Sequence, residues 1–404
     1  MNAGIEIVVV GGGYAGVMAA NRLTQRQETA VTLINPRATF VERIRLHQRV
    51  AGTHEAEHPY DEVLADRVQL LVGEVTQIDA AAQVVELATG ERRGYDYLIY
   101  AVGSGSAPMT VPGASEFAVP IATKEDADRL QSRLAGLSST APITVVGGGA
   151  TGIETAAELA DVGWAVTLVA GQGFGHYLHP RGRDAVRNQL RRLGVEVLEG
   201  AESRVATVLA DAVSLTDGRR LTSAATIWTA GFAVPELARN SGLRTDRNGR
   251  LLTDETLTSL DSDRIVAAGD SASPSGVPLR MSCQAAEQLG AAAAATILAR
   301  IEGNQPTPFA IGFVGQCLSL GRERGLVQLS HRNDHARRFH IGGRTGGRIK
   351  ELICRSTVRQ LQLEARKPGL VRIPAIMGDP ERRRLRDETS LGFITTPGSL
   401  ASHR

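Results

Sequence analysis

Hydrophobic and polar residues near the N-terminus follow the order expected for a strand, a helix and a second strand. A continuous apolar run over 5–10 (IEIVVV) predicts a buried strand. Small and apolar residues at helical spacing over 14–26 predict a helix, and the apolar run over 30–34 predicts the next strand. A glycine-rich turn separates the first strand from the helix. This order is typical of a parallel α/β unit.

The same order recurs near the middle of the chain, at 143–146, 150–162 and 165–169. Both units then continue through a turn-rich, hairpin-like segment into an apolar strand. Small residues end that strand in each case, Ala101-Val102-Gly103 in the first unit and Thr229-Ala230-Gly231 in the second. A parallel that extends through the whole unit indicates an internal duplication.

The remaining pattern predicts how the two units are joined. The Gly- and Pro-rich stretch 105–114 reads as a linker, and the segment 264–272 reads as a buried strand that ends in Gly-Asp. An Ala-rich helix is predicted over 283–301. We therefore expect an α/β fold with two Rossmann-like dinucleotide-binding domains and a smaller C-terminal α+β region. The predicted boundaries are 1–110 with 250–308 for the first domain, 111–249 for the second, and 309–404 for a C-terminal region with a mobile tail.

Composition places the chain among ordinary globular proteins, with 404 residues of which 42% are hydrophobic and 22% charged. No leader pattern and no apolar run of membrane-spanning length is present, so we expect a cytoplasmic protein. Residues 321–404 hold 18 Lys and Arg against 8 Asp and Glu. That basic region is a candidate for peripheral contact with anionic lipid at the inner face of a membrane, or for an acidic partner; a solvated surface is the alternative. We expect no nucleic-acid partner.

Three cysteines, Cys283, Cys317 and Cys354, lie far apart in the sequence. Their spacing contains no CxxC or similar pattern, which argues against a thioredoxin-type pair and against a zinc or iron–sulfur site. We expect buried, reduced thiols and no metal.

The two glycine-rich turns carry the clearest chemistry. Backbone N–H groups at a helix N-terminus bind a pyrophosphate, and close approach requires residues without a Cβ. The first turn supplies Gly11, Gly13 and Gly16, and the second supplies Gly147, Gly149 and Gly152. Two such turns at matching places predict two dinucleotides, FAD at the first and a nicotinamide nucleotide at the second.

Five segments, read in order, resemble the two-dinucleotide flavoprotein reductases of the pyridine nucleotide–disulfide oxidoreductase superfamily. They are GGGYAG, YDYLIYAVGS, GGGATGIETAAEL, TIWTAGFAVPELARNSGL and DETLTSLDSDRIVAAGDSA. Within that superfamily the chain looks most like type II NADH:quinone dehydrogenases, over roughly residues 5–301. The resemblance implies a glutathione-reductase-type arrangement of the two domains.

The resemblance also implies roles for particular residues. Asp270 would bind the flavin, and Glu154 would lie beside nicotinamide and flavin, whereas Glu158 one turn later reads as structural. The segment CQAAEQLG (283–290) is similar to the helix that lines the quinone pocket in type II dehydrogenases, with Gln284 and Gln288 on one face. Glu154, Gln284 and Gln288 are therefore the catalytic candidates. The cofactor-binding candidates are Gly11, Gly13, Tyr14, Ala15, Gly16, Asn35, Arg43, Val75, Ala101, Gly103, Gly147, Gly149, Thr151, Gly152, Ala170, Ala230, Gly231, Gly269, Asp270 and Ala285.

The acidic residue that usually holds the ribose is missing from both units. Asn35 stands there in the first unit and Ala170 in the second. Without a carboxylate at 170 the site has no means there of rejecting the 2′-phosphate of NADPH. Arg181 and Arg183 follow in the sequence and could reach such a phosphate, so NADH and NADPH both stay open.

These features favour an FAD-dependent NAD(P)H dehydrogenase that passes electrons to a quinone or quinone-like small molecule. A reductase of a small ferredoxin-type protein and a non-catalytic flavin-binding regulatory protein are the alternatives. The paired cysteine of the disulfide reductases is missing, and the C-terminal region does not look like the amphipathic membrane anchor of type II enzymes. A homodimer is one further candidate assembly.

Overall fold

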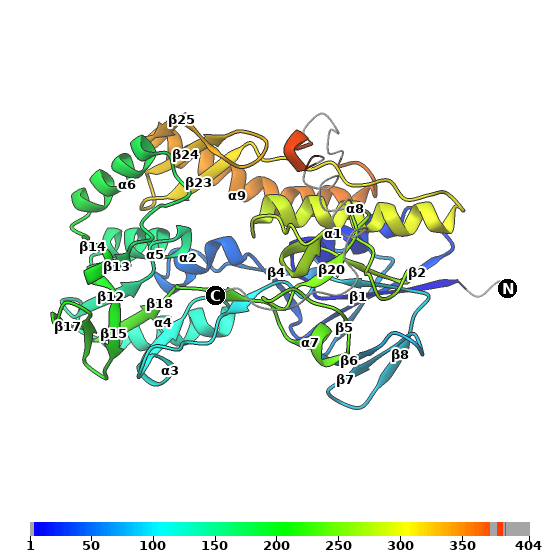
Figure 1. Cartoon of the computed structure of the whole chain (residues 1–404), viewed down its shortest axis with the longest axis horizontal. Helices are drawn as coiled ribbons and strands as arrows, with labels where there is room; N and C mark the ends of the chain where they lie inside the picture. The colour runs from blue at the N-terminus through cyan, green and yellow to red at the C-terminus, as the bar shows by residue number, and fades with distance from the viewer. Residues whose placement is uncertain (1–3, 372–377, 383, 385–404) are drawn as a thin grey trace, which may run out of the picture.

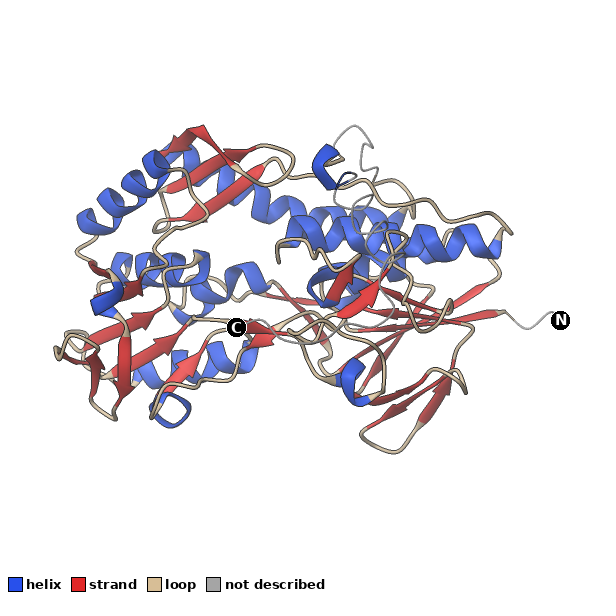
Figure 2. Ribbon diagram, in the orientation of Figure 1, coloured by secondary structure: helices blue, strands red, loops and turns tan. Residues whose placement is uncertain are grey.

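The computed structural model describes residues 4–371, 378–382 and 384. It contains two parallel sheets side by side, with a third, antiparallel sheet and long helices above them (Figure 1). Figure 2 shows the same arrangement coloured by secondary structure. The α/β fold with two Rossmann-like sheets and a smaller C-terminal α+β region is therefore confirmed. Most of the tail predicted to be mobile, including its end at 395–404, lies outside the described residues.

The first sheet has five parallel strands in the order β21-β9-β1-β2-β5. Their bounds are β1 Ile5–Val10, β2 Thr29–Asn35, β5 Val68–Val72, β9 Tyr97–Tyr100 and β21 Ile265–Ala267. The strands are apolar on both faces because helices and the antiparallel strands over residues 75–94 cover them. The late strand β21 lies at the edge of this sheet, within the segment 264–272 that was predicted to be a buried strand.

Helices α1 (Tyr14–Leu23) and α8 (Cys283–Ile301) pack on this sheet and on each other. Their contact is very close, because a Cβ at Gly290 would lie 2.2 Å from the carbonyl oxygen of Ala15. Only small residues permit such an approach, which explains the alanine run of α8. Ser282 caps α8 by accepting from the N–H of Ala285, and the helix has the predicted bounds.

The second sheet also has five parallel strands, in the order β11-β18-β12-β13-β14. Their bounds are β11 Ala118–Pro120, β12 Pro142–Val146, β13 Ala165–Gly171, β14 Glu196–Glu199 and β18 Ala225–Trp228. Helices α4 (Lys124–Ala135), α5 (Ala150–Asp161) and α6 (Pro180–Arg192) belong to this unit. Each sheet is accompanied by a three-stranded antiparallel meander, over residues 75–94 in the first unit and 205–222 in the second. The predicted duplication is thus visible in the strand pairing.

Two connections cross between the units and run beside each other. β10 (Gly105–Ser106), at the start of the predicted linker, pairs antiparallel with β19 (Phe232–Ala233).

The two units also contain shorter helices and strands. Their bounds are β3 Thr39–Val41, α2 Leu46–Val50, β4 Glu57–Pro59, β6 Val75–Asp79, β7 Val84–Leu87, β8 Arg92–Gly94, α3 Ala114–Phe117, β15 Val205–Val208, β16 Ala212–Leu215, β17 Arg220–Thr222, α7 Leu237–Asn240, β20 Leu251–Thr253 and β22 Ala272–Pro274.

The C-terminal region is an antiparallel sheet of β23 (Gly315–Ser319), β24 (Gly325–Ser330) and β25 (Ala336–Gly342), followed by the long helix α9 (Gly343–Arg366). α9 extends from this sheet to α1, which it contacts (Figure 1). Glu364 of α9 is fully buried and pairs with Arg22 of α1 at 2.7 Å. The C-terminal region is therefore joined firmly to the first unit. Across the described part of the chain, no helix combines the length and the apolar character that crossing a membrane requires.

Candidate functional site

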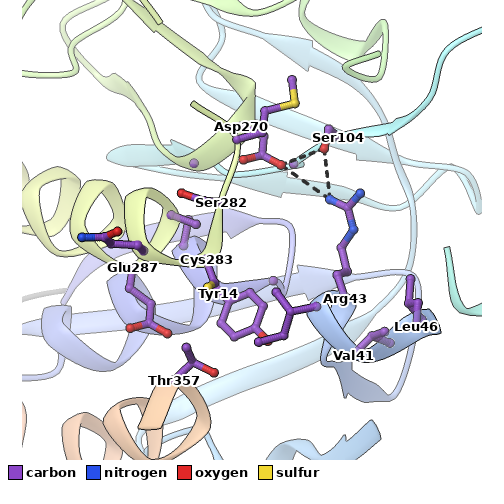
Figure 3. A pocket seen from close by; sticks show the side chains of 18 of the residues that line it. Tyr14, Val41, Arg43, Leu46, Ser104, Asp270, Ser282, Cys283, Glu287 and Thr357 are labelled. Carbon is purple, nitrogen blue, oxygen red and sulfur yellow. Dashed lines mark hydrogen bonds and ion pairs between the residues drawn. The ribbon is translucent and has the colours of Figure 1, made fainter. Parts of the chain in front are cut away.

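One cavity of about 810 Å³ lies where the two units and the C-terminal region meet. Both glycine turns, the start of α8, strands β23 and β24 and the middle of α9 contribute to its walls. Figure 3 shows part of the lining from close by. Segments far apart in the sequence therefore share a single space.

In the first turn, two glycines are required by packing and one leaves room for a ligand. Gly11 has a φ of +104°, and a Cβ there would lie 2.3 Å from the carbonyl oxygen of Ala101. A Cβ at Gly16 would lie 1.8 Å from the carbonyl oxygen of Gly11. At Gly13, by contrast, an added Cβ meets nothing within 4 Å. Gly13 is the N-cap of α1, so the open space lies where the helix presents its free N–H groups.

The second turn repeats this geometry. Gly147 has a φ of +124°, and a Cβ at Gly152 would lie 1.9 Å from the carbonyl oxygen of Gly147. A Cβ at Gly149, the N-cap of α5, again meets nothing within 4 Å. Each turn thus keeps an unfilled cradle at a helix N-terminus, which fits a pyrophosphate.

The strand ends differ between the two units. Strand pairing puts Asn35 and Ala170 at equivalent places, because Gly11 N–H donates to Ile34 and Gly147 N–H donates to Val169. Asn35 accepts from the N–H of Gly12 at 3.0 Å and donates to the carbonyl oxygen of Arg37 at 2.9 Å. The Asn35 side chain therefore fixes the backbone of the glycine turn by hydrogen bonding.

Ala170 is 8% exposed and belongs to the hydrophobic core of the second unit, together with Phe174. The segment around Phe174 fills the space beside the second turn, since a Cβ at Gly148 would lie 2.7 Å from the Phe174 backbone nitrogen. At Gly171, the last residue of β13, an added Cβ would lie 3.4 Å from the side-chain Cγ of Arg204. Arg204, which sequence reasoning missed, is thus one of the arginines close to this strand end.

Arg43, Ser104 and Asp270 form a chain of polar contacts on the cavity wall (Figure 3). Arg43 Nη1 donates to Ser104 Oγ at 3.0 Å, and Ser104 Oγ donates to Asp270 Oδ2 at 2.7 Å. Arg43 Nη1 also lies 3.6 Å from Asp270 Oδ2. Two predicted residues from distant segments are thereby brought together, and Ser104, which was not predicted, connects them.

Glu154 of α5 is paired with a lysine from the C-terminal region. Lys350 Nζ of α9 lies 3.0 Å from Glu154 Oε1, and the N–H of Ser319 donates to the same oxygen at 2.8 Å. Burial opposes ionisation of Glu154, but Lys350, His47 and the Ser319 N–H together lower its pKa. Burial lowers the pKa of His47 to about 4. At neutral pH this corner holds a carboxylate, an ammonium group and a neutral imidazole.

The cavity-facing part of α8 presents both predicted glutamines. Gln284 and Gln288 line the space, and Gln288 Oε1 is buried without a hydrogen-bond partner among the described residues. Between them in sequence, Glu287 also lines the cavity and is 6% exposed. This buried acid had no counterpart in the sequence argument.

Fifteen of the predicted residues line the cavity and the other eight do not. The lining set is Gly11, Gly13, Tyr14, Ala15, Asn35, Arg43, Ala101, Gly103, Gly149, Thr151, Glu154, Gly269, Asp270, Gln284 and Gln288. The set that does not line it is Gly16, Val75, Gly147, Gly152, Ala170, Ala230, Gly231 and Ala285. Val75 and Ala285 are buried in the protein, and Glu158, read as structural, is fully buried and accepts from Thr53.

All three cysteines line the same cavity as free thiols, although they are far apart in sequence. Burial raises the pKa of each thiol, that of Cys283 to about 12. The thiols are therefore neutral at physiological pH and lack the activation that a nucleophilic cysteine needs.

The family model for pyridine nucleotide-disulphide oxidoreductases matches residues 5–290. The chain belongs to this family. Over 290 residues it is 32% identical to an NADH dehydrogenase-like protein of Mycobacterium tuberculosis, covering 66% of this chain and 72% of that one. Over 377 residues it is 30% identical to a type II NADH:quinone oxidoreductase of the same organism, covering 80% of this chain and 79% of that one.

Two solved structures share the fold. NDH2 from Plasmodium falciparum in complex with NADH gives a TM-score of 0.73 at 16% identity, covering 92% of this chain and 100% of that one. The sulfide:quinone oxidoreductase of Aquifex aeolicus gives 0.76 at 18% identity, covering 89% and 92%. The expected family and the expected likeness to type II NADH dehydrogenases are confirmed, and the protein is an oxidoreductase.

Proposed function

We propose that the protein is an FAD-dependent NAD(P)H dehydrogenase that reduces a quinone or quinone-like small molecule. Residues 1–110 with 250–308 bind FAD, and residues 111–249 bind NAD(P)H. The observation that carries the proposal is the single cavity bordered by both glycine turns and by Gln284 and Gln288. Two cofactors and an acceptor can meet there without a long path for electrons.

The residues of the first turn fit a flavin dinucleotide. The open space at Gly13 suits the pyrophosphate, and Asn35 fixes the backbone of the turn by its bond to Gly12. Ser104 links Arg43 to Asp270, so that Arg43 offers a cation and Asp270 a carboxylate to the polar groups of the cofactor. When bound, FAD supplies the ability to take a hydride and release its electrons to a second molecule.

The second turn suits the nicotinamide nucleotide, with Gly149, Thr151 and Glu154 on the cavity wall. Relatives named as NADH:quinone oxidoreductases support NADH as a donor. Position 170 itself carries no carboxylate to reject a 2′-phosphate, and the side chain of Arg204 lies close to the next residue, Gly171. We propose weak discrimination between NADH and NADPH.

The acceptor side consists of Gln284 and Gln288 on α8, the cysteines and the apolar residues of β23 and β24. Amide groups on an apolar wall suit a small, flat molecule with carbonyl oxygens. A ferredoxin-type protein acceptor would instead dock on the outer surface, and the feature that favours this alternative is the basic C-terminal region. A purely regulatory role has no feature in its favour.

Contact with a membrane surface is part of the proposal. Phe339 and Leu352 of the C-terminal region are 62% and 67% exposed, and arginines of α9 lie close to Leu352 in sequence. Apolar and cationic side chains together suit an anionic lipid surface. The homodimer stays a prediction.

The experiment that tests the function is an anaerobic titration followed by an acceptor screen. Purified protein should carry about one FAD per chain, and NADH or NADPH should bleach the flavin absorbance. A short-chain benzoquinone should restore the absorbance, and a ferredoxin should not. Failure of NAD(P)H to bleach a bound flavin would overturn the dehydrogenase, and reoxidation by ferredoxin alone would favour the protein-acceptor alternative.

A further inference from the structure

Glu287 of α8 is a buried acid that forms no ion pair with any described residue. It is 6% exposed, it lines the cavity, and its Oε1 atom has no hydrogen-bond partner within the described ranges. A buried carboxylate without a cation or a donor is strongly unfavourable, so such a group keeps its proton. Burial accordingly raises the pKa of Glu287 well above its ordinary value.

The groups around Glu287 are neutral as well. Its carboxyl extends from α8 toward the hydroxyl of Thr357 on α9, beside the ring of Tyr14 on α1 (Figure 3). The Tyr14 hydroxyl is buried and also lacks a hydrogen-bond partner among the described residues, and Thr357 donates to its own helix at 2.8 Å. Burial raises the pKa of both Tyr14 and Cys283, the titratable groups facing the acid. Glu287 is therefore a protonated acid among neutral neighbours in this part of the cavity.

Glu154, the other acid on the cavity wall, is in the opposite state. Its partner Lys350 and the Ser319 N–H hold it as a carboxylate. A carboxylate that is already ionised has no proton to give. The two acids therefore differ in what they can do, and the difference follows from which of them has a cation.

We propose that the Glu287 carboxyl donates a proton to an oxygen of the acceptor while the acceptor is reduced in this cavity, with the Tyr14 hydroxyl holding that oxygen. The inference rests on the proposed function and narrows it to acceptors that bind protons. Glu287 lies three residues after Gln284 on α8, so both side chains can reach one bound molecule.

The chemistry balances for a quinone. Conversion to the hydroquinone takes two electrons and two protons. A hydride equivalent drawn from NAD(P)H supplies both electrons and one proton. The second proton leaves the Glu287 O–H as the O–H bond of the product forms, and the resulting carboxylate then takes a proton from solvent. The sum is NAD(P)H plus H⁺ plus quinone giving NAD(P)⁺ plus hydroquinone. An iron–sulfur or haem acceptor takes electrons alone and has no use for this acid.

The test compares acceptors in Glu287→Gln, a neutral replacement of nearly the same shape. We expect bleaching by NADH to stay at the wild-type rate and reoxidation by a short-chain benzoquinone to slow by about 10²-fold or more. Reoxidation by ferricyanide, which takes up no proton, should be unchanged. Glu302→Gln at the end of the same helix, on an exposed side chain, is the matched control. Glu287→Asp keeps the acid and should recover part of the quinone rate.

A second readout is independent of turnover. Infrared spectra at neutral pH should contain the C=O stretching band of a protonated carboxyl, which is lost in Glu287→Gln and kept in Glu302→Gln. Loss of the band with an unchanged quinone rate would overturn the proton-donor role, as would the lack of that band in the wild type. A wild type that NADH bleaches but that no quinone reoxidises would instead overturn the proposed function.

Discussion

Lys350 reaches from helix α9 across the cavity wall to Glu154 on helix α5, and the two charged atoms lie 3.0 Å apart. Both side chains are largely buried, with 12% and 10% of their surface exposed. The pair joins the C-terminal region to the helix that follows the second glycine turn. A buried charge at this place is tolerated because its partner comes from another region of the chain.

Lys350→Met should destabilise the protein by about 3–5 kcal/mol at neutral pH, because it leaves the Glu154 carboxylate buried without its cation. Urea unfolding followed by circular dichroism measures this change. Lys367→Met, on an exposed lysine just beyond the same helix, is the control and should cost little. Adding Glu154→Gln to Lys350→Met should recover part of the loss, and a double variant no more stable than the single one would contradict the account.

The pH dependence of this pair has a definite sign. In the wild type the folded state lowers the pKa of Glu154, so its stabilising contribution is complete above the ordinary carboxyl value. That contribution is lost as the pH falls through the lower, folded value. In Lys350→Met burial dominates and raises the pKa of Glu154, so the penalty is greatest at neutral pH and shrinks on acidification. The stability difference between wild type and variant should therefore narrow from about pH 7 to about pH 5.

The flavin site can be tested at Gly13, where an added Cβ meets no protein atom within 4 Å. Gly13→Val should leave the fold intact and abolish FAD binding, since the side chain enters the space kept for the pyrophosphate. Gly13→Ala should weaken binding less. The measurement is the ratio of flavin to protein absorbance after purification, with melting temperature as the check on folding. The exposed Gly136→Val is the control. A folded Gly13→Val protein with its full flavin would refute the assignment of the first turn.

The two glutamines of α8 provide a test of where electrons leave. Gln284→Leu with Gln288→Leu should keep bleaching by NAD(P)H near the wild-type rate and slow reoxidation by benzoquinones at least tenfold. The substitution removes carbonyl and amide groups from the wall of the cavity without adding charge. Stopped-flow absorbance separates the two half-reactions. Equal rates in both would show that this face of α8 does not contact the acceptor.

The sequence predicted the parallel units well because their information is local. The apolar run 5–10 and the Ala-rich run 283–301 were assigned with the bounds that the structure has. Helix α1 ends at Leu23, earlier than expected, where the Thr24 hydroxyl bonds back to the carbonyl oxygen of Asn21. The mixed pattern after 309 gave no clear assignment, because β23 to β25 form a small antiparallel sheet whose last strand is partly exposed.

The candidate site divides in the same way. Gly13, Asp270, Gln284 and Gln288 were found because short motifs carry them, and the cavity brings them together. Lys350 was missed because its partner lies in another unit and no spacing connects them. Lys350 is one of three lysines in an Arg-rich chain, and this rarity is the sequence feature that could have drawn attention to it. Glu287 was missed because burial and the lack of a cation, rather than its neighbours in sequence, make it unusual.

Ala170 decides the last prediction, on the choice between NADH and NADPH. Asn35, the residue at the equivalent position of the first unit, bonds to the glycine turn of its unit. Ala170 instead packs in the core beside Phe174, and the backbone near Phe174 fills the corresponding space. We therefore expect the wild type to use both nucleotides with kcat/KM values within about tenfold, because position 170 has no carboxylate to repel a 2′-phosphate.

For the same reason Ala170→Glu should act chiefly on stability. The new carboxylate would be buried among the apolar side chains around Ala170, which should cost about 2 kcal/mol or more. The preference between the nucleotides should change little. Arg204→Ser, which removes an arginine whose side chain lies close to Gly171, should instead weaken NADPH binding more than NADH binding. Steady-state kinetics with each nucleotide and ferricyanide measure both effects. An Ala170→Glu protein that stays fully stable and becomes selective for NADH would show that the side chain at 170 faces the ribose after all.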